Sequence, residues 1–357
     1  MKDCFQVAET TPWLAGFRRR AGQSRIPITA MLELTRRCNL RCRHCYLGEQ
    51  HLHERAKERD TEAVKASIRE WSEAGCLHLV ITGGDPMMRP DFVDIYQYAC
   101  EQGLLVTVFC DGILVDDRIL ACFSSYPPRS IEISVYGATA ETYESVTRVP
   151  GSYGQAWKGI HRLLEKGHRV FLKTVLLSIN RHELGAMKAQ AERLGCHFRY
   201  DAAIFPCLLD GSRAPLSLRV PPEDVVAAEL EDAALVERFR KAIRHLEAAP
   251  ESDALYQCGA GRIAFCSDPY GTLSPCLLAT PYRYEQNGRP FRDVWNQDLV
   301  QIRQRKRQKY GSVLAAGGLR GACTHCPAIN YLETGDEETD SPYMEQTTRL
   351  RYAAMMK

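Results

Sequence analysis

Residues 28–204 alternate between two kinds of segment, which differ in their pattern of apolar and polar positions. Short apolar runs such as 79–81 and 104–109 are typical of strands covered on both faces, and amphipathic stretches with a helical period separate them. Strands that alternate with helices pair in parallel through right-handed crossovers, so the predicted fold class is α/β, either an open doubly wound sheet or a partial barrel. The predicted strands are 28–34, 77–82, 104–109, 130–135, 169–177 and 197–204, and the helices between them are 61–74, 91–102, 116–123, 152–166 and 181–194.

Residues that favour helix ends support two of these helices. Asp60 can cap the helix at 61–74, and Gly75 follows as its stop. Ser152 and Gln155 stand at the spacing of a capping box for the helix at 152–166. The carboxyl ends of parallel strands share one edge, where α/β folds bind ligands, so residues that follow these strands are the first candidates for function.

The pattern changes after Pro206. Residues 207–221 carry glycine, serine and proline and predict a connection, and an amphipathic helix is expected at 222–248. We therefore divide the chain into five parts, which are a lead-in at 1–27, the α/β core at 28–206, a connecting segment with a helix at 207–254, a second cysteine-bearing module at 255–330 and a polar tail at 331–357.

Charge and composition exclude several classes of protein. Lys and Arg total 46 against 44 Asp and Glu, a formal charge of +2, so no general attraction to nucleic acid is expected. No apolar run reaches the roughly 18 residues of a membrane span, and the first residues lack the apolar core of a signal peptide. In such a chain, an odd total of 15 cysteines favours metal ligation in a reducing cytoplasm over disulfides.

Three cysteines, Cys38, Cys42 and Cys45, follow the first predicted strand with three and then two residues between them. Thiolates are soft ligands, so this group predicts zinc or iron–sulfur chemistry. Three thiolates would leave one iron of a 4Fe–4S cluster open, whereas zinc would need a fourth ligand, for which His44 is the only nearby candidate. Structural zinc and free thiols are the alternatives to a cluster.

The spacing of these cysteines resembles the signature of radical S-adenosylmethionine (AdoMet) enzymes. The resemblance implies that the open iron binds AdoMet through its amino and carboxylate groups. After the second predicted strand, Gly83-Gly84-Asp85-Pro86 resembles the Gly-Gly-Glu-Pro motif that holds the AdoMet amino group, with the shorter Asp85 in place of glutamate. Taken alone, this pattern is more typical of a tight turn.

The same resemblance implies further contacts to AdoMet. His44 stands where the family usually has an aromatic residue against the adenine, although a surface histidine explains it as well. Ser134 shares a strand face with Glu132 and could meet the ribose or the carboxylate. Residues 137–153 resemble the corresponding region of enzymes with a SPASM or Twitch extension, in which Arg148 is either a contact to the AdoMet carboxylate or a surface arginine.

Two other patterns near strand ends have more than one explanation. Lys173 and Arg199 lie inside apolar strands and need partners, so they either line a cavity or form a structural ion pair. Cys110-Asp111-Gly112 stands where the family often has Thr-Asn-Gly, but a β-turn explains it almost as well.

A second group of cysteines contains Cys258, Cys276, Cys323 and Cys326. Two pairs separated by a long loop also describe many zinc sites, so zinc is an open alternative. Beside the first group, the pattern resembles the Twitch domain, a shortened SPASM domain in which four cysteines hold one auxiliary 4Fe–4S cluster. The resemblance implies one auxiliary cluster rather than two, because no cysteine follows Cys326, and Cys266 is a substitute ligand.

Taken as a whole, the resemblance implies a partial (β/α)6 TIM-like barrel, a small C-terminal Fe–S domain and radical catalysis. An external electron donor of the flavodoxin or ferredoxin type would reduce the first cluster, AdoMet would be cleaved to a 5′-deoxyadenosyl radical, and this radical would abstract hydrogen from the substrate. The expected cofactors are therefore AdoMet, the 4Fe–4S cluster that binds it, and one auxiliary 4Fe–4S cluster that exchanges an electron with the substrate radical or tunes its potential.

Enzymes with these extensions act most often on ribosomally made peptides. The leading interpretation is therefore a peptide maturase that forms a cross-link or thioether or epimerises a residue. A separate leader-binding protein is an expected partner, because only 1–27 precede the first predicted strand. The alternative is dehydrogenation or rearrangement of a small molecule such as an aminocyclitol or sugar, and a third hypothesis is a zinc-bound scaffold without catalysis.

Overall fold

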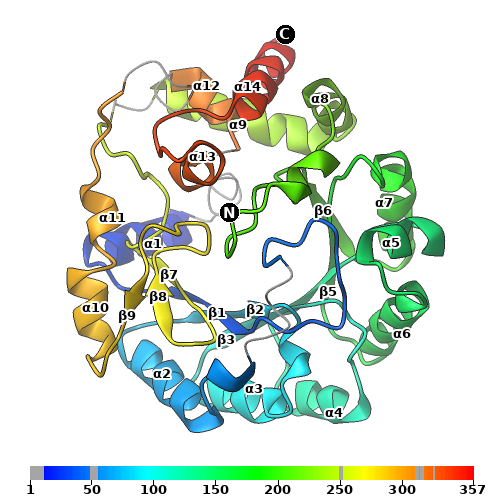
Figure 1. The fold of residues 1–357 in the computed structure, drawn as a ribbon, viewed down its shortest axis with the longest axis vertical. Helices are drawn as coiled ribbons and strands as arrows, with labels where there is room; N and C mark the ends of the chain where they lie inside the picture. Colours follow the sequence, from blue (N-terminus) through cyan, green and yellow to red (C-terminus); the bar gives the residue numbers. More distant parts are fainter. Residues whose placement is uncertain (1–11, 49–54, 249–251, 310–312, 314–316, 325) are drawn as a thin grey trace.

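The six predicted strands form one arc of parallel sheet, with helices on its convex side (Figure 1). The computed structural model describes residues 12–48, 55–248, 252–309, 313, 317–324 and 326–357. The predicted α/β fold class and partial barrel are confirmed, because each of the six strands pairs in parallel with the next. These strands are β1 (Thr29–Thr35), β2 (His78–Gly83), β3 (Leu105–Cys110), β4 (Ser130–Ser134), β5 (Val170–Val175) and β6 (His197–Asp201).

The helices of the convex side lie where the helical period predicts them. They cover alternate residues of the strands, among them the buried Leu32, Ile81, Val108 and Ile133, which share one core with Trp71. The predicted helices are α2 (Thr61–Glu73), α3 (Phe92–Glu101), α4 (Asp117–Ser125), α6 (Ser152–Glu165) and α7 (Leu184–Arg193). Helix α5 (Ala140–Thr147) and the short helices η5 (Pro86–Met88) and η7 (Ala214–Leu218) were not predicted. The short helix η6 (Arg181–Glu183) forms the start of the helix predicted at 181–194, and η4 (Arg55–Lys57) lies before α2.

One of the two helix starts differs from its prediction. The Asp60 carboxylate accepts a hydrogen bond from the amide of Ala63 at 2.8 Å and caps α2 as expected. The capping box at Ser152 is wrong, since Gly151 is the N-cap of α6 and Ser152 is fully buried. The Ser152 hydroxyl lies 2.8 Å from the hydroxyl of Thr147 instead, which ties α6 to the end of α5.

The second cysteine-bearing region shares the sheet of the barrel. Strand β7 (Ala264–Ser267) pairs in parallel with β1, and β8 (Thr272–Ser274) and β9 (Tyr284–Glu285) continue the sheet in antiparallel pairing. Phe265 of β7 packs with the core of the barrel, as does α10 (Phe291–Gln297) through Phe291. The segment also includes α11 (Gln301–Gln304), and α1 (Pro12–Gln23) lies beside it through Ala21 and Ile263.

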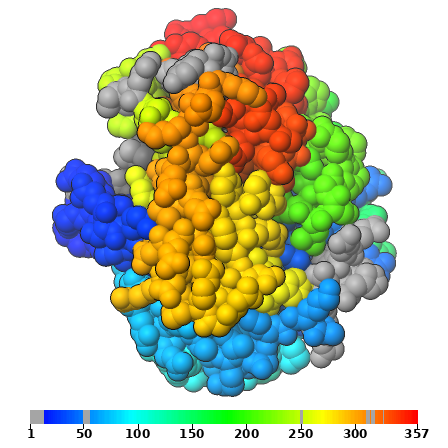
Figure 2. All heavy atoms as spheres, turned by 60° about the vertical axis from the view of Figure 1, so that its left-hand side comes forward, coloured from blue at the N-terminus to red at the C-terminus, as the bar shows by residue number. Residues whose placement is uncertain are grey.

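The rest of the C-terminal region is helical. The single helix predicted at 222–248 is interrupted, because α8 (Pro222–Leu230) ends before α9 (Ala233–Ala248) begins. The predicted polar tail contains the second half of α13 (Pro327–Thr334) and all of α14 (Pro342–Met355), which packs with α12 (Gly317–Ala322) and α8. Figure 2 shows the red C-terminal segment above the yellow and orange segment that carries β7 to α11, with the blue and cyan part of the barrel below it. None of the helices in the described ranges is both long and apolar enough to cross a bilayer.

Charged residues inside the barrel strands pair with one another. The buried Glu132 of β4 accepts a hydrogen bond from Arg199 of β6 at 2.7 Å and lies 3.7 Å from Lys173 of β5. The Lys173 ammonium group also lies 3.2 Å from the ring centre of Phe109. These contacts support the structural ion pair expected from the sequence.

Candidate active site

The loop that carries the first three cysteines begins where β1 ends, at the carboxyl edge of the sheet. Cys38, Cys42 and Cys45 are partly buried, and none of them forms a disulfide. The amide of Arg41 donates to the carbonyl oxygen of Thr147 at 3.0 Å. Helix α5, which the sequence analysis missed, therefore helps to hold this cysteine loop in place.

The environment of these thiols suits a cationic metal cluster. Burial raises the pKa of all three thiols, and the carboxylates of Asp111 and Asp85 raise the pKa of Cys38 further. Buried thiols lose their protons when a metal compensates the charge. Within the described ranges, no three His, Cys, Asp or Glu side chains are close enough to hold a single metal ion. A soft set of three thiols on one loop fits a 4Fe–4S cluster with one open iron.

Gly83 and Gly84 pack directly against the backbone that leads into the cysteine loop. The amide of Gly84 donates to the carbonyl oxygen of Thr35 at 2.9 Å. A Cβ atom on Gly83, whose φ is 139°, would lie 2.0 Å from the Thr35 oxygen, and one on Gly84 would lie 2.2 Å from the Arg37 oxygen. Only glycine allows this approach, so the pair positions the loop as well as forming the predicted turn.

Asp85 is fully buried and binds the protein backbone. One of its carboxylate oxygens accepts from the amide of Met87 at 2.9 Å, and the other accepts from the amide of Asp111 at 2.9 Å. Pro86 follows it as the first residue of η5. Burial raises the pKa of Asp85, while its backbone hydrogen bonds lower it.

Asp111 is a site residue to which the sequence analysis assigned no role, because the family motif and a simple turn explained Cys110-Asp111-Gly112 almost equally well. Its Oδ1 accepts from the amide of Ile113 at 2.8 Å, while its buried Oδ2 has no hydrogen-bond partner in the described structure. Burial raises the pKa of this carboxyl, and the neighbouring Asp85 raises it further. A buried carboxylate oxygen beside Cys38 is suited to a hydrogen-bond donor or a cation of a ligand.

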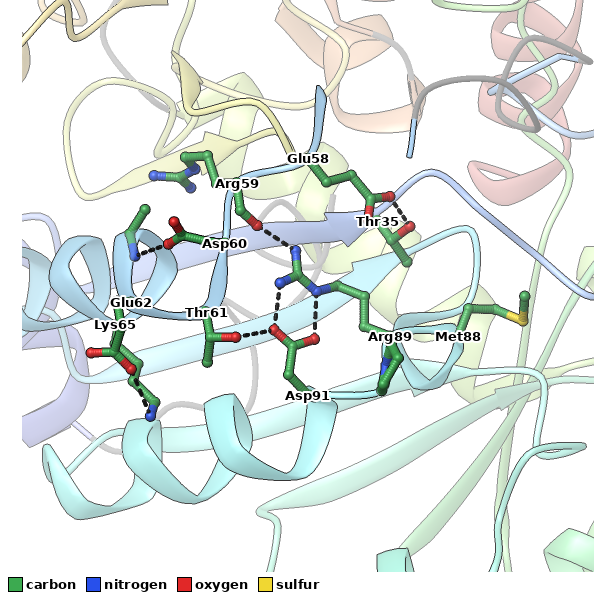
Figure 3. A network of polar contacts seen from close by, with 12 residues as sticks. Thr35, Glu58, Arg59, Asp60, Thr61, Glu62, Lys65, Met88, Arg89 and Asp91 are labelled. Atoms are coloured by element: carbon green, nitrogen blue, oxygen red, sulfur yellow. Dashed lines mark hydrogen bonds and ion pairs between the residues drawn. The ribbon is translucent and has the colours of Figure 1, made fainter. Parts of the chain in front are cut away.

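A polar network holds the segment before α2 against the start of the cysteine loop (Figure 3). The Arg89 guanidinium donates to the two carboxylate oxygens of Asp91 at 2.9 and 2.6 Å and to the carbonyl oxygen of Arg59 at 2.9 Å. Glu58 accepts a hydrogen bond from the hydroxyl of Thr35, the last residue of β1. The network therefore fixes the strand end from which the cysteine loop emerges.

The ring of His44 lies inside the protein. It meets the ring of Tyr136 edge to face, with centres 4.8 Å apart, and the Tyr136 ring lies 5.9 Å from that of Tyr143. Burial lowers the pKa of His44 to about 4, so the imidazole is neutral near pH 7. Among the described residues, neither His44 Nδ1 nor the buried Tyr143 hydroxyl has a hydrogen-bond partner. Tyr143 is a second site residue that sequence reasoning missed.

The remaining two candidates for AdoMet contacts are Ser134 and Arg148. Ser134 ends β4 on the face that carries Glu132 and is paired in register with Lys173. Arg148 is exposed and has a left-handed backbone conformation at the end of α5. Its Nε donates to the carbonyl oxygen of Arg41 at 2.7 Å, so in this structure Arg148 braces the cysteine loop.

Comparison with known proteins identifies the family. Residues 32–190, which contain the cysteine loop, the glycine turn and α5, match the family described as the radical SAM superfamily. The chain contains a radical SAM domain. Members of this family use a 4Fe–4S cluster together with AdoMet, and the arrangement around Cys38, Cys42 and Cys45 fits that pair of cofactors.

Curated relatives extend the similarity beyond the radical SAM domain. The chain is 26% identical over 337 residues to the AdoMet-dependent heme synthase of Nitratidesulfovibrio vulgaris. The aligned region covers 87% of this chain and 90% of that relative. It is 27% identical over 314 residues to the mycofactocin maturase MftC of Mycobacterium ulcerans, covering 83% of each chain. The solved structure described as native anSMEcpe with bound AdoMet has the same fold, with a TM-score of 0.69 and 11% identity over 92% of this chain and 96% of that one.

Three of the four cysteines of the second group converge in the C-terminal region of the chain. Cys258, Cys276 and Cys326 pack around one apolar cluster, and the charges of Cys276 and Cys258 raise the pKa of the Cys326 thiol beyond the effect of burial. Cys323 lies at the end of α12 and is partly buried. Cys266 lies on β7, where it is paired in register with Met31 of β1, and burial and the charge of Cys276 contribute to its raised pKa.

Proposed function

We propose that this radical SAM enzyme modifies a ribosomally made peptide by abstracting a hydrogen atom. The observation that supports this most directly is the similarity to MftC, named a mycofactocin maturase, along 83% of both chains. The proposed products are a cross-link, a thioether or an epimerised residue, as expected from the sequence. An external donor of the flavodoxin or ferredoxin type and a separate leader-binding protein are the proposed partners, and a reducing cytoplasm is the proposed location.

Cys38, Cys42 and Cys45 would hold the AdoMet-binding 4Fe–4S cluster. When bound, this cluster supplies the electron that cleaves AdoMet and yields a 5′-deoxyadenosyl radical. Gly83 and Gly84 hold the cysteine loop against the strand ends. This close packing supports their proposed role in positioning AdoMet.

Side chains on three strand ends would complete the AdoMet site. Asp85 would act by holding the backbone at Asp111, and the Oδ2 atom of Asp111 is suited to accept from the ammonium group of AdoMet. The neutral ring of His44 is suited to pack against the adenine. Ser134, Pro86 and Arg148 are the remaining proposed contacts.

Cys258, Cys276, Cys323 and Cys326 would hold one auxiliary 4Fe–4S cluster. The common apolar surroundings of Cys258, Cys276 and Cys326 support this assignment, because a buried, fully thiolate-ligated cluster is shielded from solvent. Cys266 is the less suitable ligand, since it lies on the β7 strand beside β1.

The proposal is tested with protein that has been reconstituted with iron and sulfide without oxygen. The protein is reduced with dithionite and given AdoMet and the short peptides encoded beside its gene, and both 5′-deoxyadenosine and the peptide mass are measured. We expect 5′-deoxyadenosine formation, and a mass change in one peptide that is absent from a Cys38→Ala variant. A colourless, zinc-loaded protein that does not cleave AdoMet would reject radical catalysis.

A second candidate substrate class is a small molecule with a tetrapyrrole ring. The supporting observation is the similarity to an AdoMet-dependent heme synthase over 87% of this chain. These relatives favour a tetrapyrrole over the aminocyclitol or sugar expected as the small-molecule alternative. Turnover of an iron porphyrin with propionate side chains, in an assay where no peptide changes mass, would replace the peptide proposal with this one.

A further inference from the structure

The end of α5 holds the backbone on both sides of Cys42. The amide of Arg41 donates to the carbonyl oxygen of Thr147 at 3.0 Å. The amide of Arg43 donates to the carbonyl oxygen of Val146, also at 3.0 Å. Both acceptors belong to the last turn of α5, where carbonyl groups have no partner within the helix. The segment from β4 to α5 therefore fixes the part of the cysteine loop that presents Cys42.

Tyr136 lies in the same segment and contacts the same part of the loop. Its ring meets the His44 ring edge to face, with centres 4.8 Å apart, and His44 stands two residues after Cys42. Burial raises the pKa of the Cys42 thiol, and a hydrogen bond from the Tyr136 side chain lowers it. The ring of Tyr136 thus packs on the cysteine loop while its hydroxyl group is directed at Cys42.

The position of Tyr136 is fixed by its backbone and by the neighbouring helix. Its carbonyl oxygen accepts a hydrogen bond from the buried Asn180 side chain at 3.2 Å. The next residue is Gly137, on which a Cβ atom would lie 2.6 Å from the amide nitrogen of Tyr143. The rings of Tyr136 and Tyr143 have centres 5.9 Å apart. A side chain held in this way keeps its hydroxyl group in one place with little further loss of conformational entropy.

Ser134 acts on the hydroxyl group of Tyr136. The two residues stand two positions apart and share one face of the chain at the end of β4. Burial raises the pKa of Tyr136, and hydrogen bonding from the Ser134 side chain lowers it. When the serine hydroxyl donates to the phenol oxygen, the phenol hydrogen is left for the sulfur, and each hydrogen bond polarises the next.

The three thiols of the first group differ in the donors that reach them. Cys38 accepts from the amide of Leu40 at 3.4 Å. Burial raises the pKa of Cys45, and the backbone amide of Leu47 lowers it. At Cys42 a donor comes from a side chain of another element. Hydrogen bonds to sulfur help to set the potential of an iron–sulfur cluster, and a donor on a side chain can be removed by substitution whereas a backbone amide cannot.

We propose that Tyr136 is a positioning residue for the first cluster, whose hydroxyl donates a hydrogen bond to the Cys42 thiolate and makes the cluster easier to reduce. The bond offsets negative charge on the sulfur, and a reduced cluster carries one more negative charge than an oxidised one. A tyrosine ordinarily loses its proton near pH 10, so the donor is present near pH 7. The inference rests on the proposed function, because it requires the cluster at Cys38, Cys42 and Cys45.

The reduction potential of the first cluster tests this inference. Reconstituted full-length protein is titrated without oxygen and without AdoMet, and the reduced clusters are followed by electron paramagnetic resonance. The signal that changes shape when AdoMet is then added is assigned to the first cluster. In Tyr136→Phe the ring against His44 is retained and the hydroxyl is lost. We expect reduction to become about tenfold less favourable, a potential lower by about 59 mV for one electron.

Tyr153→Phe is the matched control. Its hydroxyl donates to the carbonyl oxygen of Ala138 at 2.8 Å, and its ring centre lies 5.7 Å from that of Tyr143. This variant therefore also loses a hydroxyl from the same row of aromatic rings, and it should keep the potential of the unchanged protein. Ser134→Ala retains the phenol and should lower the potential by a smaller amount. It provides a second test if Tyr136→Phe does not take up iron.

An unchanged potential in Tyr136→Phe would overturn the inference, and so would equal shifts in Tyr136→Phe and Tyr153→Phe. If Tyr136→Phe takes up no iron, an unchanged potential in Ser134→Ala has the same meaning. Absence of any cluster signal from the unchanged protein contradicts the proposed function. A cluster that forms and has the same potential with and without the Tyr136 hydroxyl contradicts this inference alone.

Discussion

A carboxylate oxygen of Asp85 accepts a hydrogen bond from the backbone amide of Asp111 at 2.9 Å. The contact joins the turn after β2 to the end of β3, and the other oxygen of Asp85 holds the amide of Met87. Asp85, which the sequence analysis selected as a candidate contact to AdoMet, therefore also joins two neighbouring strand ends.

Replacing this carboxylate by an amide should destabilise the protein. Asp85→Asn leaves only one acceptor oxygen for two buried amides, so the free energy of unfolding should fall by about 1–3 kcal/mol. Denaturant unfolding of the metal-free protein measures the change. Asp94→Asn on the exposed face of α3 is the control and should change the stability by less than about 0.5 kcal/mol. Equal stability of the two variants would contradict this role of Asp85.

A methyl group at position 84 should displace the cysteine loop. Its carbon would meet the Arg37 carbonyl oxygen at 2.2 Å, and backbone cannot give way as a flexible side chain can. We expect Gly84→Ala to lower the free energy of unfolding by about 1–3 kcal/mol and to reduce iron incorporation at the first cysteine group. Gly154→Ala on the open surface of α6 is the matched control, where no atom lies within 4 Å, and it should stabilise the protein slightly.

The network of Arg89 and Asp91 should make stability depend on acid pH. Burial would raise the pKa of Asp91, but hydrogen bonds from Arg89 and Thr61 overcome this and lower the pKa to about 2. The unfolded carboxyl titrates near pH 4, so the stabilisation is complete above that pH and is lost as the pH falls from about 4 to 2. Asp91→Asn should remove about 2 kcal/mol at pH 7 and flatten the acid limb of unfolding curves. An unchanged acid limb would show that Asp91 does not contribute.

Removal of one cysteine from the second group should eliminate the proposed auxiliary cluster and leave the proposed AdoMet-binding cluster in place. Cys276→Ser should lower the iron content from about eight to about four atoms per chain and leave reductive AdoMet cleavage at the first site. Iron analysis and electron paramagnetic resonance of the reduced protein measure the two effects. Cys100→Ser, in α3 and far from both groups in sequence, should keep the full iron content. If Cys276→Ser also kept the full content, Cys276 would not be a ligand.

The last helix should depend on one buried ion pair. Arg351 of α14 donates to both carboxylate oxygens of Glu229 in α8 at 2.7 and 2.8 Å, and both side chains are buried. Arg351→Leu leaves Glu229 buried without its partner and should cost about 3–5 kcal/mol of unfolding free energy. Arg349→Leu removes an exposed pair with Glu345 and should cost less than about 1 kcal/mol. Similar losses in the two variants would contradict the proposed importance of burial.

Sequence patterns predicted the parts of the structure that depend on local spacing. Strands such as β2 and β3 are short apolar runs, and their period of two residues determines which side chains face the helices. Asp60 caps α2 by accepting a hydrogen bond from the amide of Ala63, three residues along the chain. Cys38, Cys42 and Cys45 follow strand β1 on one short loop. Because that loop carries the whole set, their spacing alone indicated the family.

Only the tertiary structure decided which distant residues meet. Three contacts join segments whose local sequence patterns do not predict that they meet. They are the pairing of β7 with β1, the packing of α14 through Arg351, and the position of Asp111 beside Asp85. The same holds for Arg36 and Arg283, which are brought to one oxygen of Asp268 by the added strands of the sheet. Short-range periodicity encodes elements, whereas the contacts between elements depend on burial and charge pairing that arise only when the chain has folded.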